Sequence, residues 1–317
     1  MSFVTAVIPT HNRVGQLVRT LESLRQSTIS GLGSLEVIVV ANACTDGTAD
    51  ALARAPWPFR LRTVEEPIAN LNRARNRGVA AAKGEFVALL DDDVWVEPGW
   101  LEAIVEAFSR HPASLLAGRV ELWWDAVARP PWMSDSACRL LSCTDLGSSP
   151  LELDNSQSIV GANLAFRRTT WESIGGFVEG LDRSGTELLS GGDTEFVYRA
   201  LRAGHRLFYC PAMAVRHWVA PHRVSLGYLD KVASGRGHTA VQLALLGRQS
   251  RLPSLLLRGS VMWLRGASAG LRSLAPRDSQ RRIDARLYRQ RGRGMAEAAW
   301  SSLLRRLMPK GGREATS

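Results

Sequence analysis

The stretch that decides the fold is Phe86-Val87-Ala88-Leu89-Leu90-Asp91-Asp92-Asp93, in which five apolar residues run directly into three aspartates. A short apolar run that follows Gly84 is typical of an interior parallel strand, buried on both faces. In open α/β sheets, ligands bind beyond the carboxyl ends of such strands. The three carboxylates are therefore expected to face a cleft, and the fold class is expected to be α/β.

Three adjacent aspartates repel one another, and a bound divalent cation is the simplest way to keep them ionised together. Mg²⁺ or Mn²⁺ is the expected ion, because such ions take oxygen ligands and leave coordination positions for phosphate oxygens. The cluster thus predicts a substrate that carries a diphosphate. The alternative is an acidic loop that caps a helix beginning near Glu97, since acidic residues favour helix N-termini.

The composition is that of a globular protein. With 317 residues, 45% of them hydrophobic, the chain is long enough for one large or two small domains. The cysteines lack the paired spacing of a zinc site and are too few for a dense disulfide framework, which suits a reducing compartment. No signal-peptide pattern and no stretch of about 18 apolar residues occurs, so we expect a cytoplasmic protein without a spanning helix.

Positive charge is concentrated at the C-terminal end. The net charge is +10, but residues 248–317 hold 16 Lys and Arg against 4 Asp and Glu, while residues 1–247 hold 24 against 26. A uniformly basic domain would indicate nucleic acid, whereas a near-neutral body with a basic tail indicates an anionic surface met by one segment. We therefore expect no nucleic-acid partner.

Strands and helices alternate along the first half of the chain. Apolar runs bounded by polar turns predict strands, and Leu17, Leu21 and Leu24 lie at the spacing of one helix face. The pattern is that of βαβ units around a mainly parallel sheet. Strands are expected at residues 3–8, 35–40, 61–64 and 86–90, and a helix at 70–82.

Several motifs, taken in order, resemble those of family 2 glycosyltransferases, and the resemblance covers about residues 3–220. It implies a GT-A fold, which is a Rossmann-like mixed sheet flanked by helices, an inverting reaction and a nucleoside-diphosphate sugar donor. The motifs are Val7-Ile8-Pro9-Thr10-His11-Asn12-Arg13, Val39-Val40 to Asp46-Gly47, Ala74-Arg75-Asn76-Arg77-Gly78, Leu89-Leu90-Asp91-Asp92-Asp93, Val160 to Arg168, Ile174-Gly175-Gly176-Phe177 and Gly191-Gly192-Asp193-Thr194-Glu195.

Side chains at the strand ends can hold the donor. Thr10, Asn12 and Asn42 follow neighbouring strands, where a base and a ribose could form hydrogen bonds. Arg75, on the helix before the acidic strand, can pair with diphosphate oxygens or neutralise Asp91, and both roles stay open. The residues predicted to bind the donor are Pro9, Thr10, Asn12, Arg13, Asn42, Asp46, Arg75, Asp91 and Asp92.

The resemblance also implies the metal ligands. Asp91 and Asp93 match the two acids of the family's DXD signature, with Asp93 the direct ligand and Asp92 nearer the ribose. His217 resembles the histidine that completes metal coordination in some members, and a structural role is its alternative. The predicted metal ligands are Asp91, Asp93 and His217.

Asp193 is the expected general base. It lies at the N-terminal edge of a helix predicted over residues 194–203, where the helix dipole favours a carboxylate, and it matches the family's catalytic aspartate. From the residues alone a plain N-cap would look the same. The chain departs from the family pattern at Ala41-Asn42, where paired acids are usual, and at Gly192, where a glutamate is usual.

Residues 120–158 lack regular periodicity and are expected to form a long irregular insert. Long loops in compact domains are commonly binding segments, and exposed aromatic rings stack on sugars. Tryptophans of this segment are therefore candidates for acceptor contact, with ordinary core packing as the alternative. The predicted acceptor-side residues are Trp123, Trp124, Trp132, Asn163, Gly191, Gly192, Thr194 and Glu195.

A seven-residue repeat marks the tail. Its arginines, Arg251, Arg258, Arg265 and Arg272, would form one stripe on a helix, because seven residues are nearly two turns. Such a helix could lie on a membrane, or pack on the catalytic body with its arginines solvated. The adjacent apolar surface is predicted to consist of Leu255, Leu256, Val261, Met262 and Trp263.

The domain prediction is a catalytic domain at residues 1–224, with a donor half at 1–119 and an acceptor half at 120–224, followed by a basic helical extension at 225–317. The predicted activity is inverting transfer of a sugar to a hydroxyl of a glycan, a lipid-linked acceptor or another glycoconjugate. The basic tail adds peripheral attachment to the inner face of the cell membrane. The alternatives are a catalytically silent sugar-nucleotide-binding or scaffold protein and, with only Arg13 as a basic residue in the first loop, a nucleotidyltransferase.

Overall fold

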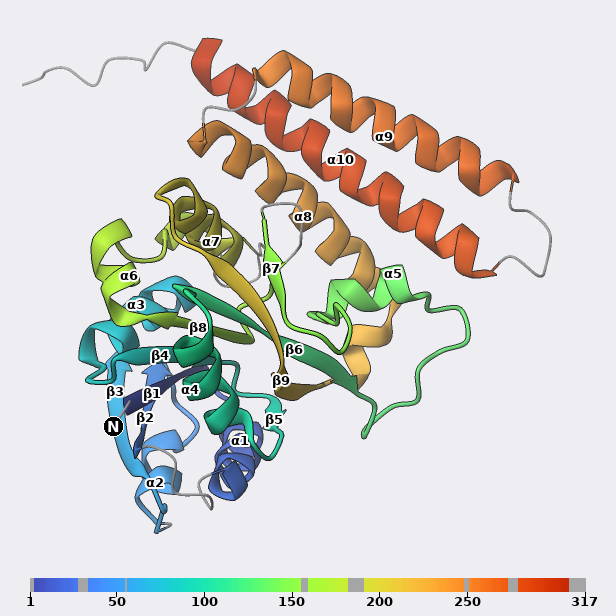
Figure 1. The fold of residues 1–317 in the computed structure, drawn as a ribbon. Helices are drawn as coiled ribbons and strands as arrows, with labels where there is room; N and C mark the ends of the chain where they lie inside the picture. Colours follow the sequence, from blue (N-terminus) through green and yellow to red (C-terminus); the bar gives the residue numbers. More distant parts are fainter. Residues whose placement is uncertain are drawn as a thin grey trace, which may run out of the picture. The chain divides into compact units, whose positions relative to one another are not determined.

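The structure is a computed structural model, which describes residues 3–27, 34–54, 56–154, 159–181, 191–247, 251–272 and 279–307. The described residues form two compact units. The first unit comprises the described parts of residues 3–129, 141–181 and 192–221. The second comprises residues 130–140, residue 191 and the described residues from 222 onward. Figure 1 shows a sheet with helices in the first unit and long helices in the second.

The N-terminal part of the first unit is a parallel sheet with the strand order β3-β2-β1-β4. β4 is buried along its whole length, as its apolar sequence predicts. The elements are β1 (Phe3–Thr10), α1 (Val14–Ser27), β2 (Ser34–Asn42), α2 (Thr48–Ala53), β3 (Arg60–Glu66), α3 (Leu71–Ala81) and β4 (Phe86–Leu90).

The rest of the first unit extends this sheet with antiparallel and parallel strands. β8 runs antiparallel to β4 and to β6, and β9 runs parallel to β6. Short strands β5 and β7 pair antiparallel with opposite halves of β9. The added strands are β5 (Val94–Val96), β6 (Leu115–Trp123), β7 (Leu151–Leu153), β8 (Asn163–Arg167) and β9 (Leu207–Trp218). In the described part of the chain they complete one mixed sheet of nine strands, which confirms the predicted α/β fold class.

Helices cover both faces of the sheet. On one face, Leu17 and Leu21 of α1 and Ile104 of α4 (Trp100–Arg110) lie in one buried cluster. On the other, Val79 of α3 and Phe196 of α7 (Gly192–Arg202) lie in a second cluster. Alternate residues of the strands feed the two clusters, because successive side chains of a strand point to opposite faces. The remaining short helices of this unit are α6 (Arg168–Ile174) and the 3₁₀ turn η2 (Glu179–Leu181).

One local prediction differs from the structure. The segment expected to be an irregular insert contains regular elements, because β6 runs to Trp123 and β7 pairs with β9. The apolar stretches at 207–210 and 213–217 belong to a single strand, β9. Its pairing with β6 changes register between Gly118 and Arg119, so the interruption seen in the sequence is an irregularity inside a strand.

The second unit is helical. Its elements are α5 (Asp135–Cys138), α8 (Leu226–Leu246), α9 (Leu252–Arg272) and α10 (Ser279–Leu307), with the 3₁₀ turns η1 (Arg139–Leu141) and η3 (Pro221–Val224) at its borders. α10 lies against both α8 and α9, and Met295 of α10 joins Val241 of α8 and Met262 of α9 in one apolar cluster. None of the described helices has the length and hydropathy that a membrane crossing requires.

Glycines let α9 and α10 approach closely. A Cβ atom added to Gly259 of α9 would lie 2.6 Å from the backbone nitrogen of Ala296, and one added to Gly292 of α10 would lie 2.6 Å from that of Trp263. Real Cβ atoms do not come this close to backbone atoms. Glycine disfavours a helix by about 1 kcal/mol relative to alanine, and here that cost is offset by close packing of two helices.

This packing predicts opposite effects for two substitutions in α9. Gly259→Ala should lower the free energy of unfolding by about 1–3 kcal/mol, because the methyl group overpacks the contact with α10. Gly270→Ala is the matched control, since a Cβ there meets nothing within 4 Å. It should raise stability by up to about 1 kcal/mol through helix propensity alone. Urea denaturation followed by circular dichroism measures both, and equal effects of the two variants would contradict the close packing.

Candidate active site

Three predicted ligands come together at one edge of the sheet. Asp91 follows β4, Asp93 precedes β5, and His217 lies near the end of β9. One ligand atom from each lies within 4.8 Å of the others. The Nε2 atom of His217 is 3.2 Å from Asp93 Oδ1 and 3.8 Å from Asp91 Oδ2. Pairing of β5 with β9 produces this meeting, because it sets Val94 opposite His217.

The chemistry of these side chains fits a divalent cation. Asp93 and His217 are buried, whereas the Asp91 side chain is 30% exposed, which leaves one side of the cluster open. Asp91 and Asp93 each offer a carboxylate oxygen and His217 offers a ring nitrogen, so all three side chains can act as metal ligands. Carboxylate and imidazole ligands suit Mn²⁺, and Mg²⁺ is commonly bound through one or two carboxylates together with substrate phosphates.

Arg13 and Asp92 support the cluster from the end of β1. Arg13 Nη1 donates to Asp92 Oδ1 at 3.1 Å and to Asp93 Oδ2 at 3.2 Å. The Thr10 hydroxyl donates to Asp92 Oδ2 at 2.7 Å. Burial, together with the charge of Asp93, raises the pKa of Asp92 to about 6. In this arrangement Asp92 holds Arg13 and Thr10, and Arg13 fixes one oxygen of Asp93 so that the other faces His217.

Asp193 lies in the first turn of α7, as predicted. Its Oδ2 atom accepts a hydrogen bond from the Gly161 backbone N–H at 2.6 Å, and Oδ1 accepts one from the Thr194 N–H at 2.8 Å. The side chain is partly exposed. Two N–H donors and the helix N-terminus stabilise its negative charge. The carboxylate is therefore oriented and accessible, as a proton acceptor must be.

Arg75 links the two acidic groups. This buried side chain places Nη2 4.0 Å from Asp91 Oδ1, and Nη1 donates to Asn72 at 3.3 Å. A Cβ atom added to Gly161 would lie 2.5 Å from Arg75 Nη2 and 3.0 Å from Asp193 Oδ2. The guanidinium thus lies near the carboxylate of Asp91, and both it and the carboxylate of Asp193 lie beside Gly161. Gly161 belongs to one of the motifs found in the sequence, but no role was predicted for it. Because glycine has no side chain, the Arg75 guanidinium and the Asp193 carboxylate can both come close to its backbone.

The other predicted donor-side residues tie loops together. Asn42 is buried, and its amide donates to the carbonyls of Glu66 and Ile68 and accepts from the Asn70 N–H. Asn12 accepts from the Thr45 N–H at 2.7 Å. Asp46 accepts from the Val14 N–H and the Thr48 hydroxyl, and these bonds, led by the one from Thr48, lower its pKa. Pro9 is buried within β1. Their contacts to a donor stay predictions.

Two predicted acceptor-side residues have structural roles in the first unit. Asn163 has no exposed surface, and its side chain bonds Trp100 and the carbonyls of Arg119 and Met213. Glu195 pairs with Arg199, which also donates to the carbonyls of residues 174–176. An acceptor cannot reach Asn163. Gly192 and Thr194 lie in the first turn of α7 on either side of Asp193, while Gly191 and Trp132 belong to the second unit.

Trp123 lies on the opposite face of the sheet from His217. In the pairing of β6 with β9 it stands opposite Trp218, the residue after His217, so the two side chains point to different faces. The guanidinium groups of Arg19 and Arg216 lie 4.7 and 5.3 Å from its ring centre. Its contact with a sugar stays a prediction. Trp124, just after β6, is partly buried, and its role stays a prediction.

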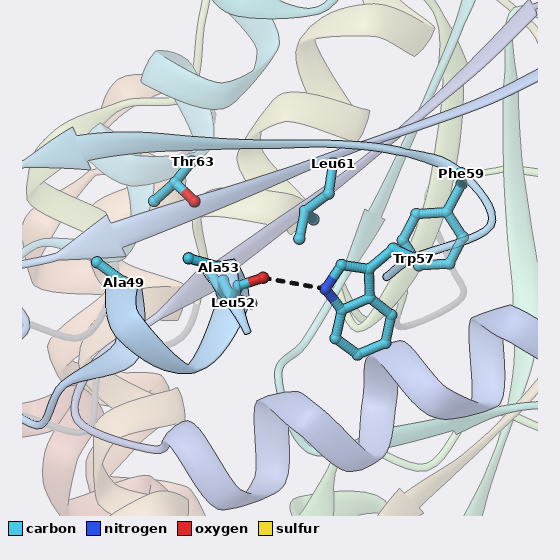
Figure 2. A pocket seen from close by; sticks show the side chains of 7 residues that line it. All are labelled: Ala49, Leu52, Ala53, Trp57, Phe59, Leu61 and Thr63. Atoms are coloured by element: carbon cyan, nitrogen blue, oxygen red, sulfur yellow. Dashed lines mark hydrogen bonds between the residues drawn. The ribbon is translucent and has the colours of Figure 1, made fainter. Parts of the chain in front are cut away.

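A separate hollow of about 310 Å³ lies beside the start of β3. Figure 2 shows its lining, with the Trp57 indole N–H donating to the Leu52 carbonyl at 3.2 Å. β3 and β5 are at opposite ends of the strand order, so this hollow is distant from the acidic cluster. The lining residues are Ala49, Leu52, Ala53, Trp57, Phe59, Leu61 and Thr63.

Solved structures share the fold over nearly the whole chain. A mannosyltransferase from Pyrobaculum calidifontis, solved with GDP-Man and Mn²⁺, has a TM-score of 0.56 at 20% identity and is matched over 99% of this chain and 76% of its own. Staphylococcus aureus TarS 1–349 with UDP has a TM-score of 0.54 at 16% identity, over 95% of this chain and 92% of its own. These likenesses show the GT-A fold.

Sequence relatives are glycosyltransferases. The pre-mycofactocin glycosyltransferase of Mycobacterium tuberculosis is 30% identical over 86% of this chain, which spans only 54% of that relative. The glucosyl-dolichyl phosphate glucuronosyltransferase of Haloferax volcanii is 23% identical over 78% of this chain and 79% of its own length. The model of the family described as glycosyl transferase family 2 matches residues 5–173. The resemblance first seen in the motifs is thus confirmed, and the chain belongs to glycosyl transferase family 2.

Proposed function

We propose that this enzyme transfers a sugar from a nucleoside-diphosphate sugar to an acceptor hydroxyl with inversion at the anomeric carbon. The observation that carries the proposal is that Arg75, which lies near Asp91 of the acidic cluster, meets Asp193 of α7 beside Gly161. A diphosphate at the cluster and a proton acceptor at Asp193 would then flank one sugar. Inversion follows from a single displacement, in which the attacking and departing oxygens lie on opposite sides of that carbon.

Each group has a defined task in this reaction. Asp91, Asp93 and His217 would hold Mg²⁺ or Mn²⁺, which supplies positive charge to the departing diphosphate. Asp193 accepts the proton of the acceptor hydroxyl as its oxygen forms the new bond to the anomeric carbon. The bond from that carbon to the diphosphate oxygen breaks with its electron pair on the nucleoside diphosphate. Arg75 is placed to pair with the diphosphate as well as with Asp91.

The donor and acceptor classes follow from the relatives by analogy. Solved neighbours were crystallised with GDP-Man, UDP and UDP-GlcNAc, which supports a sugar nucleotide as the donor of this enzyme. The name of one relative specifies a dolichyl-phosphate-linked substrate. We therefore favour a lipid-linked acceptor over a soluble glycan. Such an acceptor agrees with the proposed site of action, the cytoplasmic face of a membrane that the basic C-terminal helices would contact.

A panel of nucleotide sugars tests the proposal. The full chain, supplied with each sugar nucleotide and Mn²⁺, should release nucleoside diphosphate from one or a few of them, and chelation by EDTA should stop the release. Isothermal titration with the same panel separates binding from turnover. Tight binding without release in the presence of mixed lipid and glycan acceptors would favour a silent sugar-nucleotide-binding protein instead.

A further inference from the structure

Helix α9 has two apolar faces, and only one of them is buried. Leu252, Leu255 and Met262 are almost fully covered, so part of the surface predicted to be exposed beside the arginines is core. On the remaining surface of the helix, Leu257 is 66% exposed and Leu264 is 58% exposed. They are seven residues apart and share one face of α9. Exposed leucines aligned on a helix commonly mark an interaction surface.

A row of arginines runs beside these leucines. Arg258 and Arg265 directly follow Leu257 and Leu264, and Arg251 continues the row one repeat earlier, while the side chain of Arg272 lies outside the described residues. All three described arginines are exposed, and α9 contains no acidic residue. Among the described residues, none of the three forms an ion pair with a carboxylate within 4.0 Å. Their charges are therefore available to an external anion.

Arg291, Trp263 and Trp300 add a further basic side chain and exposed aromatic rings on α9 and α10. Arg291 of α10 is exposed over its whole side chain and backbone taken together, whereas its guanidinium group is largely desolvated. This desolvation, together with the nearby positive charge of Arg258, lowers the pKa of Arg291. Trp263 is 44% exposed on α9, and Trp300 is 52% exposed on α10. In Figure 1 these two helices run side by side along their length. Tryptophan, leucine and arginine together are the residues that favour the boundary between lipid headgroups and acyl chains.

We propose that the exposed face of α9 binds an anionic lipid bilayer, with Leu257 and Leu264 inserted at the acyl boundary and Arg251, Arg258 and Arg265 on lipid phosphates. Charge complementarity selects this occupant, since residues 248–317 hold 16 basic and 4 acidic residues. Guanidinium groups bind phosphate oxygens through two parallel hydrogen bonds. α9 does not have the hydropathy to span a membrane, so it would lie in the plane of the interface.

Sedimentation with vesicles tests the proposal on the full chain. The protein should bind vesicles of mixed phosphatidylglycerol and phosphatidylcholine at low salt, and bind phosphatidylcholine alone weakly. Raising the salt should release it, because charges are screened beyond about 8 Å at physiological ionic strength. No sugar donor is present, so the outcome is independent of the proposed transfer reaction. Equal binding to both vesicle types, or none to either, would overturn the proposal.

Matched double variants locate the contact. Arg258→Gln with Arg265→Gln should weaken partitioning into the vesicles about 30-fold, because each basic residue near an anionic surface strengthens binding by a factor of about five. Arg54→Gln with Arg77→Gln removes two exposed charges from the first unit and should change it far less. Leu257→Ser with Leu264→Ser should also reduce binding, whereas the exposed pair Leu146→Ser with Leu151→Ser should not.

Size-exclusion chromatography with light scattering tests the competing occupant, a second copy of the chain. The wild type should be monomeric in the absence of vesicles. A wild-type dimer that Leu257→Ser with Leu264→Ser converts to a monomer would show that this face joins two copies, and would overturn the lipid proposal. Circular dichroism of each variant confirms that the helices are retained. Equal losses in the α9 variants and their controls would likewise count against a specific face.

Discussion

Asp93→Ala is expected to abolish metal binding and turnover while leaving the fold intact. The Asp93 side chain is only 3% exposed, and both of its oxygens are engaged, one by Arg13 and one beside His217. Loss of a direct ligand should cost more than the roughly 10- to 100-fold caused by changes to groups that only support a ligand. Asp92 still pairs with Arg13 in the variant, so the loop between β4 and β5 keeps a charged partner.

Mn²⁺ binding followed by electron paramagnetic resonance, together with nucleoside diphosphate release, measures this effect. Asp125→Ala is the matched control, because Asp125 is an exposed aspartate paired with Arg19 and should leave Mn²⁺ affinity unchanged. Circular dichroism would verify folding of both proteins. Full activity of Asp93→Ala at saturating Mg²⁺ or Mn²⁺ would remove this residue from the metal site.

Asp193→Asn is expected to retain donor binding and to lose transfer by about 10²- to 10⁴-fold, the usual range for loss of a general base. An amide oxygen can still accept the Gly161 and Thr194 hydrogen bonds one at a time, but it cannot take a proton from the acceptor. The loss should therefore appear in kcat, while the affinity for the sugar nucleotide changes little.

Asp50→Asn is the control for this substitution, because Asp50 also lies in the first turn of a helix, α2, and is exposed. It should transfer sugar at the wild-type rate. Calorimetric titration with the nucleotide sugar would show whether donor binding survives in Asp193→Asn. Turnover of that variant at a rate close to that of the wild type would assign proton removal to another group.

The sheet and its acidic edge were predictable because they depend on local patterns. The apolar run of β4 needs burial on both faces, and its sequence alone shows this. Hydrogen-bond partners could not be predicted in this way, because spacing along the sequence does not show which residues far apart in the chain form hydrogen bonds. Asn42 and Asn163 have the right chemistry for ligand contact, yet the loop after β3 and the backbone of β6 and β9 take up their amides. The sheet face on which Trp123 lies could not be predicted either, because the register of β6 against β9 decides it.

The C-terminal helices are a second case in which contacts between distant residues override a local sequence pattern. Glycine lowers helix propensity, so Gly259 and Gly266 would disfavour a helix at these positions if propensity alone decided. Both positions lie close to the backbone of α10, where any side chain would collide. Helix propensity describes an isolated helix, whereas the need for glycine at these two positions comes from close contact with the neighbouring helix α10. The exposure of Arg251, Arg258 and Arg265 agrees with the row expected from their spacing, because a spacing of seven depends only on helix geometry.

The position of β9 in the chain has a consequence for how the enzyme can be divided. His217 is supplied by the last strand of the first unit, whereas Asp91 and Asp93 lie more than a hundred residues earlier. β5, which follows Asp93 directly, pairs with β9 in the described sheet. During synthesis, Asp91 and Asp93 therefore leave the ribosome well before the strand that carries His217 and pairs with β5. A fragment that ends with the family match at residue 173 would lack Asp193 as well. The three candidate metal ligands can therefore come together only after β9 has joined the sheet.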